Sequence, residues 1–182
     1  GVESTRPGCT PLTADEEIER LAQLIDPVLH ASTVPVSIDT YHAKTADYAL
    51  SKGAHILNDI WGLHYDPDMA AIAAKYKVPV IIMHNSNDTN YGDIIEDMKA
   101  FFFCAIDKAL KEGVTPQQIW LDPGVGFGKT EEQATMLAKS IHNSGKAVVG
   151  TYTKDIAITK QSMTMDIAQR LEFHLQVIVE AV

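Results

Sequence analysis

The middle of the sequence contains the apolar run Val78-Pro79-Val80-Ile81-Ile82-Met83, which passes directly into the polar pair His84-Asn85. Four other short apolar runs have the same form, and helical stretches separate all five. Strands that alternate with helices build a parallel sheet that is buried on both faces. Polar groups then gather at the carboxyl ends of the strands, the edge where barrels of this kind carry their catalytic residues. The other runs are 34–38, 55–57, 119–121 and 147–149, which lead into Asp39, Asn58-Asp59, Asp122-Pro123-Gly124 and Gly150-Thr151.

This alternation predicts an α/β fold and leaves two architectures open. Five parallel strands could form an open doubly wound sheet or part of an eight-stranded barrel. A ring of only five strands is too small to close around filled layers of side chains, so a barrel would need further strands. Parallel crossovers of this length are right-handed in either case.

The composition is that of an ordinary globular domain. The chain has 182 residues, 46% of them hydrophobic and 21% charged, which is enough for one domain with a sizeable core. No apolar run approaches the roughly 20 residues of a membrane span. The polar start, residues 3–6, predicts the absence of a signal peptide. The two cysteines form no framework, so we expect a reducing cytoplasm, with Cys104 as a small core residue.

The net charge of −9 argues against a nucleic-acid-binding surface, which needs clustered lysine and arginine. An anionic substrate would therefore need a local positive pocket in a negative field. The candidates beside predicted strand ends are Arg6, Lys129 and Lys154.

Helix boundaries are predicted from capping signals. Two capping boxes, 13–16 and 130–133, open helices that run to about Ser32 and about Asn143. Asp66-Pro67 predicts a helix start with Asp66 as the N-cap. An apolar stripe at helical spacing predicts a long core-packed helix over about 92–112. Further predictions are a helix over about 41–52 closed by Gly53, a turn at Thr115-Pro116 and a final helix over about 165–182.

Three acidic or amide positions at strand ends are candidates for chemistry. Asp39 is interpreted first as the N-cap of the helix that begins near Tyr41, with a ligand contact as the alternative. Asn58-Asp59 fits loop capping and ligand binding equally well. Asp122 opens the loop Asp-Pro-Gly-Val-Gly-Phe-Gly-Lys-Thr, whose glycines allow a backbone to approach a ligand closely. This loop lacks the spacing of a Walker loop, and a plain glycine-rich connector remains the alternative.

Other kinds of site are excluded by the sequence pattern. The seven histidines show no paired ligand spacing, so no all-histidine metal site is predicted and no residue is assigned as a metal ligand. Neither cysteine has an adjacent base and no Gly-x-Ser-x-Gly elbow exists, so covalent catalysis has no nucleophile. The remaining carboxylates, amides and lysines suit a planar heterocycle with several ring donors and acceptors, because a carboxylate can accept two parallel N–H bonds.

At these positions the sequence resembles the dihydropteroate synthase family of pterin-binding enzymes. The matching motifs occur in the family's order and span most of the chain. The resemblance implies a (β/α)8 barrel, of which about five strands lie in this chain, and a single, partial pterin-binding domain over residues 1–182. The motifs are residues 3–8, 37–40, 58–60, 83–84 and 121–130, and Gly150-Thr151 with Lys154.

The resemblance also implies roles for individual residues. One group lines a pterin pocket, and within it Asp122 holds the pyrimidinone edge. A second group closes over or flanks p-aminobenzoate. Asp39, Asp122 and Lys154 are the catalytic residues that it implies. The pterin group is Asp39, Asn58, Met83, Asp122, Gly150 and Lys154; the p-aminobenzoate group is Thr5, Arg6 and Pro7, on a mobile loop, with Phe127 and Lys154.

The implied reaction joins 6-hydroxymethyl-7,8-dihydropterin diphosphate to p-aminobenzoate and releases pyrophosphate. It uses Mg²⁺, whose ligands lie in a first-strand loop with an Asn-Val-Thr-Pro-Asp-Ser-Phe motif that this sequence does not contain. The implied protein is a cytoplasmic homodimer and a sulfonamide target. Its partners are small molecules, with no nucleic acid and no membrane.

The sequence departs from the family pattern in three ways. The first-strand loop and the last strand, with its Arg-Val-His signature, are absent, which suggests a fragment or a partial record. The family's Ser-Arg-Lys reads Tyr152-Thr153-Lys154 here, and Asp155 follows where a hydroxyl often receives the benzoate carboxylate. Like charges there would repel. Two alternatives therefore stand beside the synthase: a pterin-binding paralogue without activity, and a barrel that binds methyltetrahydrofolate and methylates a corrinoid.

Overall fold

A computed structural model of the chain describes residues 1–3 and 10–144. In this part, four strands form one parallel sheet with the order β1-β2-β3-β4, so each strand pairs with its neighbour in sequence. The predicted α/β fold is confirmed, together with four of the five predicted strands; the fifth, at 147–149, lies outside the described residues. The strands are β1 (Ser37–Asp39), β2 (Ile56–Asp59), β3 (Val80–Met83) and β4 (Ile119–Asp122).

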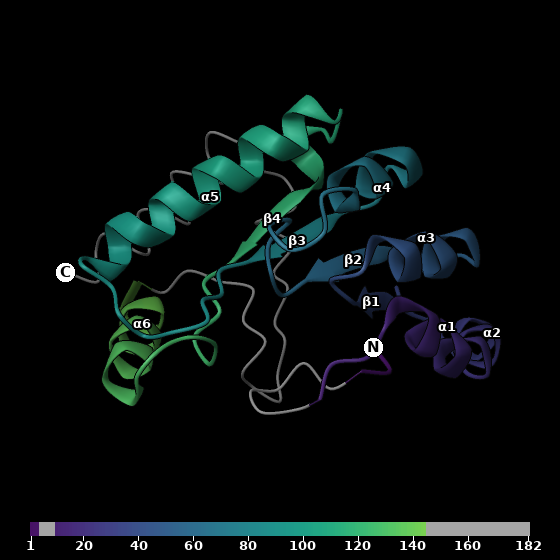
Figure 1. Ribbon diagram of the computed structural model, residues 1–182, viewed down its shortest axis with the longest axis horizontal. Helices are drawn as coiled ribbons and strands as arrows, with labels where there is room; N and C mark the ends of the chain where they lie inside the picture. The colour runs from purple at the N-terminus through teal and green to yellow at the C-terminus, as the bar shows by residue number, and fades with distance from the viewer. Residues whose placement is uncertain (4–9, 145–182) are drawn as a thin grey trace.

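The helices follow one another around one side of the sheet, from α1 to α5 as the colour runs from purple to teal in Figure 1. Each crossover between parallel strands passes through at least one helix, as a βαβ unit requires. The elements are α1 (Ala14–Ala22), α2 (Ile25–Ala31), α3 (Ala43–Ser51), α4 (Met69–Tyr76), α5 (Ile94–Lys111), the short 3₁₀ helix η1 (Pro116–Gln118) and α6 (Glu131–Ser144).

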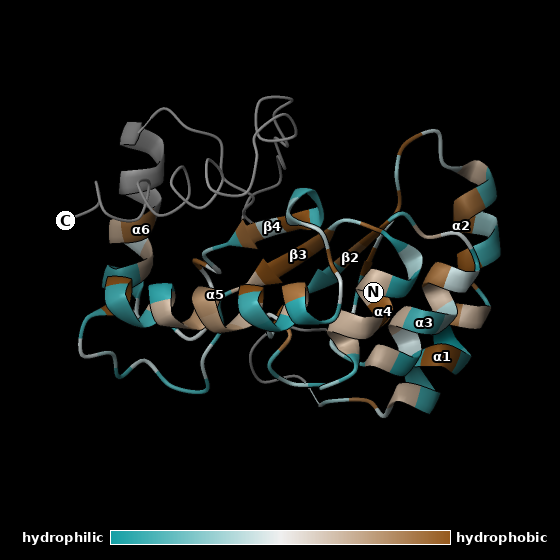
Figure 2. Ribbon diagram, turned by 90° about the horizontal axis from the view of Figure 1, so that it is seen from above, coloured by the Kyte–Doolittle hydropathy of each residue, from teal (hydrophilic) through white to brown (hydrophobic). Residues whose placement is uncertain are grey.

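The two faces of the sheet differ because successive strand residues point to opposite sides. Alternate residues such as Leu57, Val80 and Ile82 join the main core beneath the helices. The residues between them, such as Ile81 and Trp120, form a separate small cluster on the other face. Figure 2 shows β3 as strongly hydrophobic along its length, in agreement with a strand that is buried on both faces.

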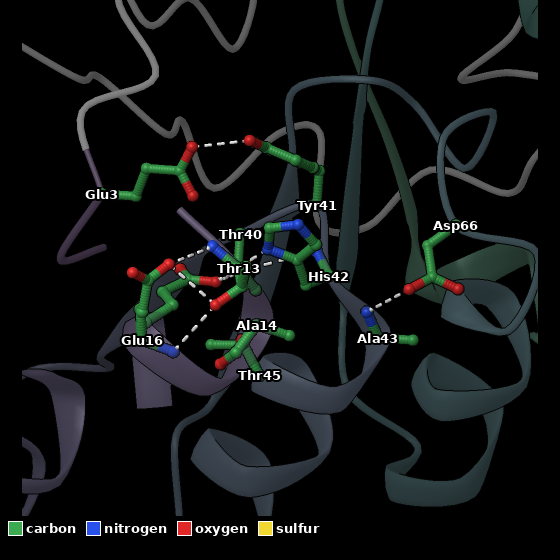
Figure 3. Close-up of polar contacts among 11 residues, drawn as sticks. Glu3, Thr13, Ala14, Glu16, Thr40, Tyr41, His42, Ala43, Thr45 and Asp66 are labelled. Carbon is green, nitrogen blue, oxygen red and sulfur yellow. Dashed lines mark hydrogen bonds and ion pairs between the residues drawn. The ribbon is translucent and has the colours of Figure 1, made fainter. Parts of the chain in front are cut away.

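The predicted capping boxes are present. The Thr13 hydroxyl accepts a hydrogen bond from the Glu16 N–H, and the Glu16 carboxylate accepts one from the Thr13 N–H at 2.8 Å (Figure 3). The same exchange joins Thr130 to Gln133 at the start of α6. These local pairs explain why the helix starts were predictable from four-residue patterns.

Two helix predictions were wrong. The helix expected to run from residue 13 to about Ser32 divides into α1 and α2, because Pro27 has no N–H to donate to the preceding turn and fits only in the first turn of a new helix. The helix expected to start at Asp66 begins at Met69, with Asp68 as its N-cap. Asp66 instead accepts a hydrogen bond of 2.8 Å from the Ala43 N–H, at the start of α3 (Figure 3).

The core position predicted for Cys104 was also wrong, since this residue is exposed. On α5 the buried stripe includes Phe102, Ala105 and Ile106, as predicted. Cys104 lies between them in sequence but, at about 100° per residue, on the other side of the helix. Among the described residues, no helix combines the length and the apolar character that crossing a membrane requires.

Candidate functional site

Four residues predicted to bind a pterin lie at one edge of the sheet and on one of its faces. The strand register pairs Asp39 with Asn58 and Met83 with Asp122. All four lie at or next to the carboxyl end of their strand, and the alternation of side chains directs them to the face opposite the helices. The sheet therefore brings together residues that are more than 80 positions apart in sequence.

Asp39 and Asn58 contact each other directly. The Asn58 side-chain N–H donates a hydrogen bond of 3.0 Å to Oδ1 of Asp39. Oδ1 of Asn58 is buried, and among the described residues no donor contacts it. The preferred interpretation of Asp39 as an N-cap was wrong, because α3 begins at Ala43 with His42 as its N-cap. The pair presents an acceptor and an amide to the same face of the sheet.

The two residues of Asn58-Asp59 have separate roles, because neighbours on a strand point to opposite faces. Asp59 is fully buried and accepts hydrogen bonds of 2.8 Å from the N–H groups of Trp61 and Leu63. Burial raises the pKa of Asp59 to about 6, although the two hydrogen bonds act in the opposite direction. Asp59 therefore shapes the loop after β2, and Asn58 is the residue that remains for a ligand.

Asp122 is fully buried at the start of the glycine-rich loop. Its Oδ1 accepts a hydrogen bond of 2.8 Å from the Gly124 N–H, which bends the chain back across β3. Gly124 has a φ of 59°, and a Cβ atom at this position would lie 2.1 Å from the carbonyl oxygen of His84. Only glycine allows this close passage, which explains the glycine at this position of the loop.

Lys129 forms hydrogen bonds within its own loop. Its Nζ donates hydrogen bonds of 2.8 Å to the carbonyl oxygens of Gly124 and Phe127, and it lies 3.0 Å from Nδ1 of His84. Because an ammonium group can only donate, Nδ1 of His84 must be the acceptor and the imidazole proton resides on Nε2. The sequence did not suggest this contact, since 45 positions separate the two residues.

Burial governs the ionisation of this pair. It lowers the pKa of Lys129 to about 8, while the charge of Asp122 acts in the opposite direction. Burial, with the charge of Lys129 as the second cause, lowers the pKa of His84 to about 3, so His84 is neutral at physiological pH. One cation is thus held under the loop that begins at Asp122.

An apolar wall completes the described part of the site. Met83 is fully buried and forms a small cluster with Tyr41 and Ile60, against which Trp61 and Phe127 pack. These side chains come from the ends of β1, β2 and β3 and from the glycine-rich loop. A carboxylate, an amide and a flat apolar wall at one edge are suited to a planar heterocycle that hydrogen-bonds along its rim.

The other predicted site residues lie outside the described residues, so their roles remain predictions. They are Thr5, Arg6 and Pro7 of the predicted p-aminobenzoate loop, and Gly150 and Lys154 of the predicted pterin pocket.

Comparisons with known proteins identify relatives of this chain. A family model described as "Pterin binding enzyme" matches residues 1–182. The dihydropteroate synthase of Bacillus subtilis (strain 168) is 45% identical over 130 residues, which cover 71% of this chain and 46% of the relative. The chain thus spans about half the length of the curated relatives that it matches.

Solved structures give the same result for the fold. The dihydropteroate synthase of Clostridium difficile, crystallised in the presence of pteroic acid, aligns with a TM-score of 0.77 and 37% identity, over 99% of this chain and 71% of that one. The enzyme from Thermus thermophilus, in complex with 4-aminobenzoate, aligns with a TM-score of 0.71 and 35% identity, over 100% and 72%. The expectation of a (β/α)8 barrel, of which this chain is a part, is therefore confirmed.

Proposed function

Because the chain belongs to the pterin-binding enzyme family, we propose that the protein containing it is a dihydropteroate synthase. The reaction would join 6-hydroxymethyl-7,8-dihydropterin diphosphate to p-aminobenzoate and release pyrophosphate. The observation that carries this proposal is the convergence of Asp39, Asn58, Met83 and Asp122 on one face and one edge of the sheet.

Each described residue has a specific task in this proposal. Asp122 accepts hydrogen bonds from the amino-pyrimidinone edge, since a carboxylate can receive two parallel N–H donors. Asn58, held by Asp39, offers its buried Oδ1 to a second ring donor. Met83 packs on the face of the ring, and Phe127 borders the p-aminobenzoate side.

The site also suits the charge that develops during the reaction. The bond between the pterin methylene carbon and the diphosphate oxygen breaks early, which leaves a positive charge on the pterin. Asp39 and Asp122 would stabilise that charge before the amine of p-aminobenzoate attacks the carbon. No protein nucleophile is needed in this sequence of steps.

Mg²⁺ would assist by neutralising the departing pyrophosphate. The resemblance assigns its ligands to a first-strand loop that is not in this sequence, and we assign no described residue to them. A homodimer and a cytoplasmic location are further parts of the proposal. We also propose Arg6 and Lys154 as the cations beside the anionic substrate, because Lys129 already donates hydrogen bonds within its own loop.

The test is an assay of the complete protein with both substrates and Mg²⁺. We expect formation of dihydropteroate and equimolar pyrophosphate, both of which stop when p-aminobenzoate is omitted. No product at any substrate concentration, despite tight pterin binding by calorimetry, would overturn the proposal in favour of a non-catalytic paralogue. Methyl transfer from methyltetrahydrofolate to a corrinoid would overturn it in favour of the related methyltransferases.

The paralogue is kept as a second candidate because of one sequence feature. Tyr152-Thr153-Lys154-Asp155 lacks the arginine of the family motif and adds a carboxylate near the predicted benzoate position. Asp155→Ser separates the two candidates. In a synthase whose Asp155 faces the benzoate carboxylate, this variant should lower the KM for p-aminobenzoate, whereas in a paralogue neither protein should turn over.

A further inference from the structure

A second group of polar side chains lies near the end of β1 and is not used by the proposed reaction. It consists of Glu3, Glu17 and His42, here named the Glu–Glu–His cluster. One donor atom of each residue lies within 4.8 Å of the donor atoms of the other two. Carboxylate oxygen and imidazole nitrogen are both good ligands for divalent metals of the first transition row.

Three separate elements bring the cluster together. Glu17 lies on α1, and its side chain is fully buried. His42 is the N-cap of α3 and is partly buried. Glu3 belongs to the N-terminal segment, which passes directly beside β1, since a Cβ atom on Gly1 would lie 2.3 Å from the carbonyl oxygen of Asp39.

The Glu17 carboxylate is only half satisfied. Its Oε2 accepts a hydrogen bond of 2.8 Å from the Thr40 hydroxyl and lies 3.1 Å from Nδ1 of His42. Its Oε1 is buried, and no donor among residues 1–3 and 10–144 contacts it. A buried carboxylate oxygen that accepts no hydrogen bond destabilises the folded protein. A metal ion that accepts its lone pair would remove this penalty.

The negative charges of the two glutamates in the cluster also favour a cationic ligand. Glu3 accepts a hydrogen bond of 2.5 Å from the Tyr41 hydroxyl, and Figure 3 shows these two groups pointing toward one another. In the described part of the chain, no lysine or arginine forms an ion pair with Glu3 or Glu17. A cation between the two carboxylates would balance them.

We propose that the Glu–Glu–His cluster binds one divalent transition-metal ion of the Zn²⁺ type. Donor atoms that share a tetrahedral zinc ion, each about 2.1 Å from it, lie roughly 3.4 Å apart. The donor atoms of the cluster lie within 4.8 Å of one another, so binding would draw them together by up to roughly 1.4 Å. The imidazole favours zinc over Mg²⁺, which prefers an all-oxygen octahedron. Zinc would bind Nδ1 of His42 in place of the proton that this nitrogen shares with Glu17, and the neutral imidazole would then carry its single proton on Nε2.

Two neighbouring aromatic rings contact the His42 imidazole and hold its orientation. The Tyr41 ring lies 4.4 Å from the imidazole, and the Tyr65 ring meets it edge-on at 5.9 Å. These contacts restrict the rotation of the imidazole and so keep Nδ1 toward Glu17. A bound ion would tie the N-terminal segment, through Glu3, to the loop after β1, which makes it a clamp on that segment and not part of the proposed pterin chemistry.

The site can be tested by zinc binding to the complete protein, measured by calorimetry with excess Mg²⁺ present. We expect one zinc-binding event that His42→Ala and Glu17→Gln each weaken by more than 100-fold, since loss of even an outer partner of a metal ligand costs about 10–100-fold. Co²⁺ should give a visible absorption band in the wild type that both variants lack.

His30→Ala and Glu16→Gln are the matched controls, because they remove an exposed histidine and an exposed glutamate outside the cluster. Both should bind zinc as the wild type does. Thermal unfolding shows whether each variant is folded. Added zinc should raise the Tm of the wild type and the controls but not that of the two site variants. Zinc binding that His42→Ala leaves unchanged, or no zinc binding at all, would overturn the proposal.

Discussion

The side-chain N–H of Asn58 donates a 3.0 Å hydrogen bond to Oδ1 of Asp39, across the boundary between β1 and β2. This bond fixes both side chains before any ligand arrives. Preorganised donors and acceptors bind a ligand without a further cost of ordering. The pair is therefore the natural place to begin testing the site.

Asn58→Asp should destabilise the protein, because two carboxylates would then face each other at hydrogen-bonding distance. We expect a loss of roughly 1–3 kcal/mol in the free energy of unfolding at pH 7. Repulsion raises the pKa of one carboxylate in the folded state, so the loss should shrink as the pH falls below that pKa. The double variant Asp39→Asn with Asn58→Asp restores one acceptor and one donor, and it should recover most of the stability in urea titrations. Equal stability of the single and double variants would contradict this account.

Asp122→Asn should weaken pterin binding by roughly 10–100-fold, because hydrogen bonds from the ring to a charged acceptor are worth about 1.5–3 kcal/mol. Oδ1 can still accept from the Gly124 N–H in this variant, so the loop should keep its shape. Calorimetry with 6-hydroxymethylpterin on the complete protein gives the affinity. Asp68→Asn, at an exposed position, is the control and should bind normally. Unchanged affinity in Asp122→Asn would remove Asp122 from the pterin pocket.

Gly124→Ala should be far more damaging than Gly53→Ala. Both glycines have a positive φ, and alanine is strained at either position, by about 1 kcal/mol. Only at Gly124 would the new Cβ lie 2.1 Å from a backbone oxygen, whereas nothing lies within 4 Å at Gly53. We expect a difference of at least about 2 kcal/mol between the two variants in chemical denaturation. A similar loss in both would mean that the loop can move away from His84.

Lys129→Met should loosen the glycine-rich loop, because the carbonyl oxygens of Gly124 and Phe127 lose their common donor. The expected cost is about 1–3 kcal/mol. Lys111→Met is the matched control: its ammonium is exposed and pairs with Asp107 on the same helix, so a change within about 0.5 kcal/mol is expected. Loss of protection of the Phe127 amide in hydrogen exchange, in the lysine 129 variant alone, would locate the effect in the loop.

Asp59 should titrate near pH 6 in the folded protein, since burial raises its pKa to about 6. A carboxyl group whose pKa is higher in the folded state binds more protons there than in the unfolded chain. Its contribution to stability therefore decreases as the pH rises from about 4 to 6. Carboxyl-carbon NMR of the wild type, with Asp59→Asn to assign the signal, gives the midpoint directly. A midpoint below about pH 4 would show that the hydrogen bonds from Trp61 and Leu63 outweigh burial.

The features that were predictable from sequence are the ones encoded locally. Thr13-Ala14-Asp15-Glu16 contains both partners of its capping box, and β3 is a continuous apolar run. The convergence of Asp39, Asn58 and Asp122 also followed from sequence, because parallel strands place their carboxyl ends along one edge. The alternation of side chains along a strand predicts separate roles for Asn58 and Asp59, because the two residues point to opposite faces of the sheet. The motif by itself does not distinguish them.

The missed features depend on contacts between distant parts of the chain. The sequence predicts Lys129 as a candidate anion site. It could not reveal the contact between Lys129 and His84, because the two residues are 45 positions apart. The sequence predicts Asp66 as the N-cap of its own helix, whereas its carboxylate accepts a hydrogen bond from the Ala43 N–H at the start of α3, 23 residues earlier. The histidine spacing excluded a metal site made only of histidines, and it could not reveal His42 beside two glutamates from other elements. Pro27 is the exception, because a proline inside a helical pattern itself predicts the break between α1 and α2.

The sequential order of the four strands has a consequence for how the protein is made. Every strand pairs with the one synthesised just before or after it, so each unit can dock onto its predecessor as the chain emerges from the ribosome. Pairing between successive strands makes each closing loop about as short as a parallel crossover allows, so less chain entropy is lost than if strands from distant parts of the sequence paired. The polar edge would then be assembled progressively, with Asp39 and Asn58 in place before Asp122 has been translated.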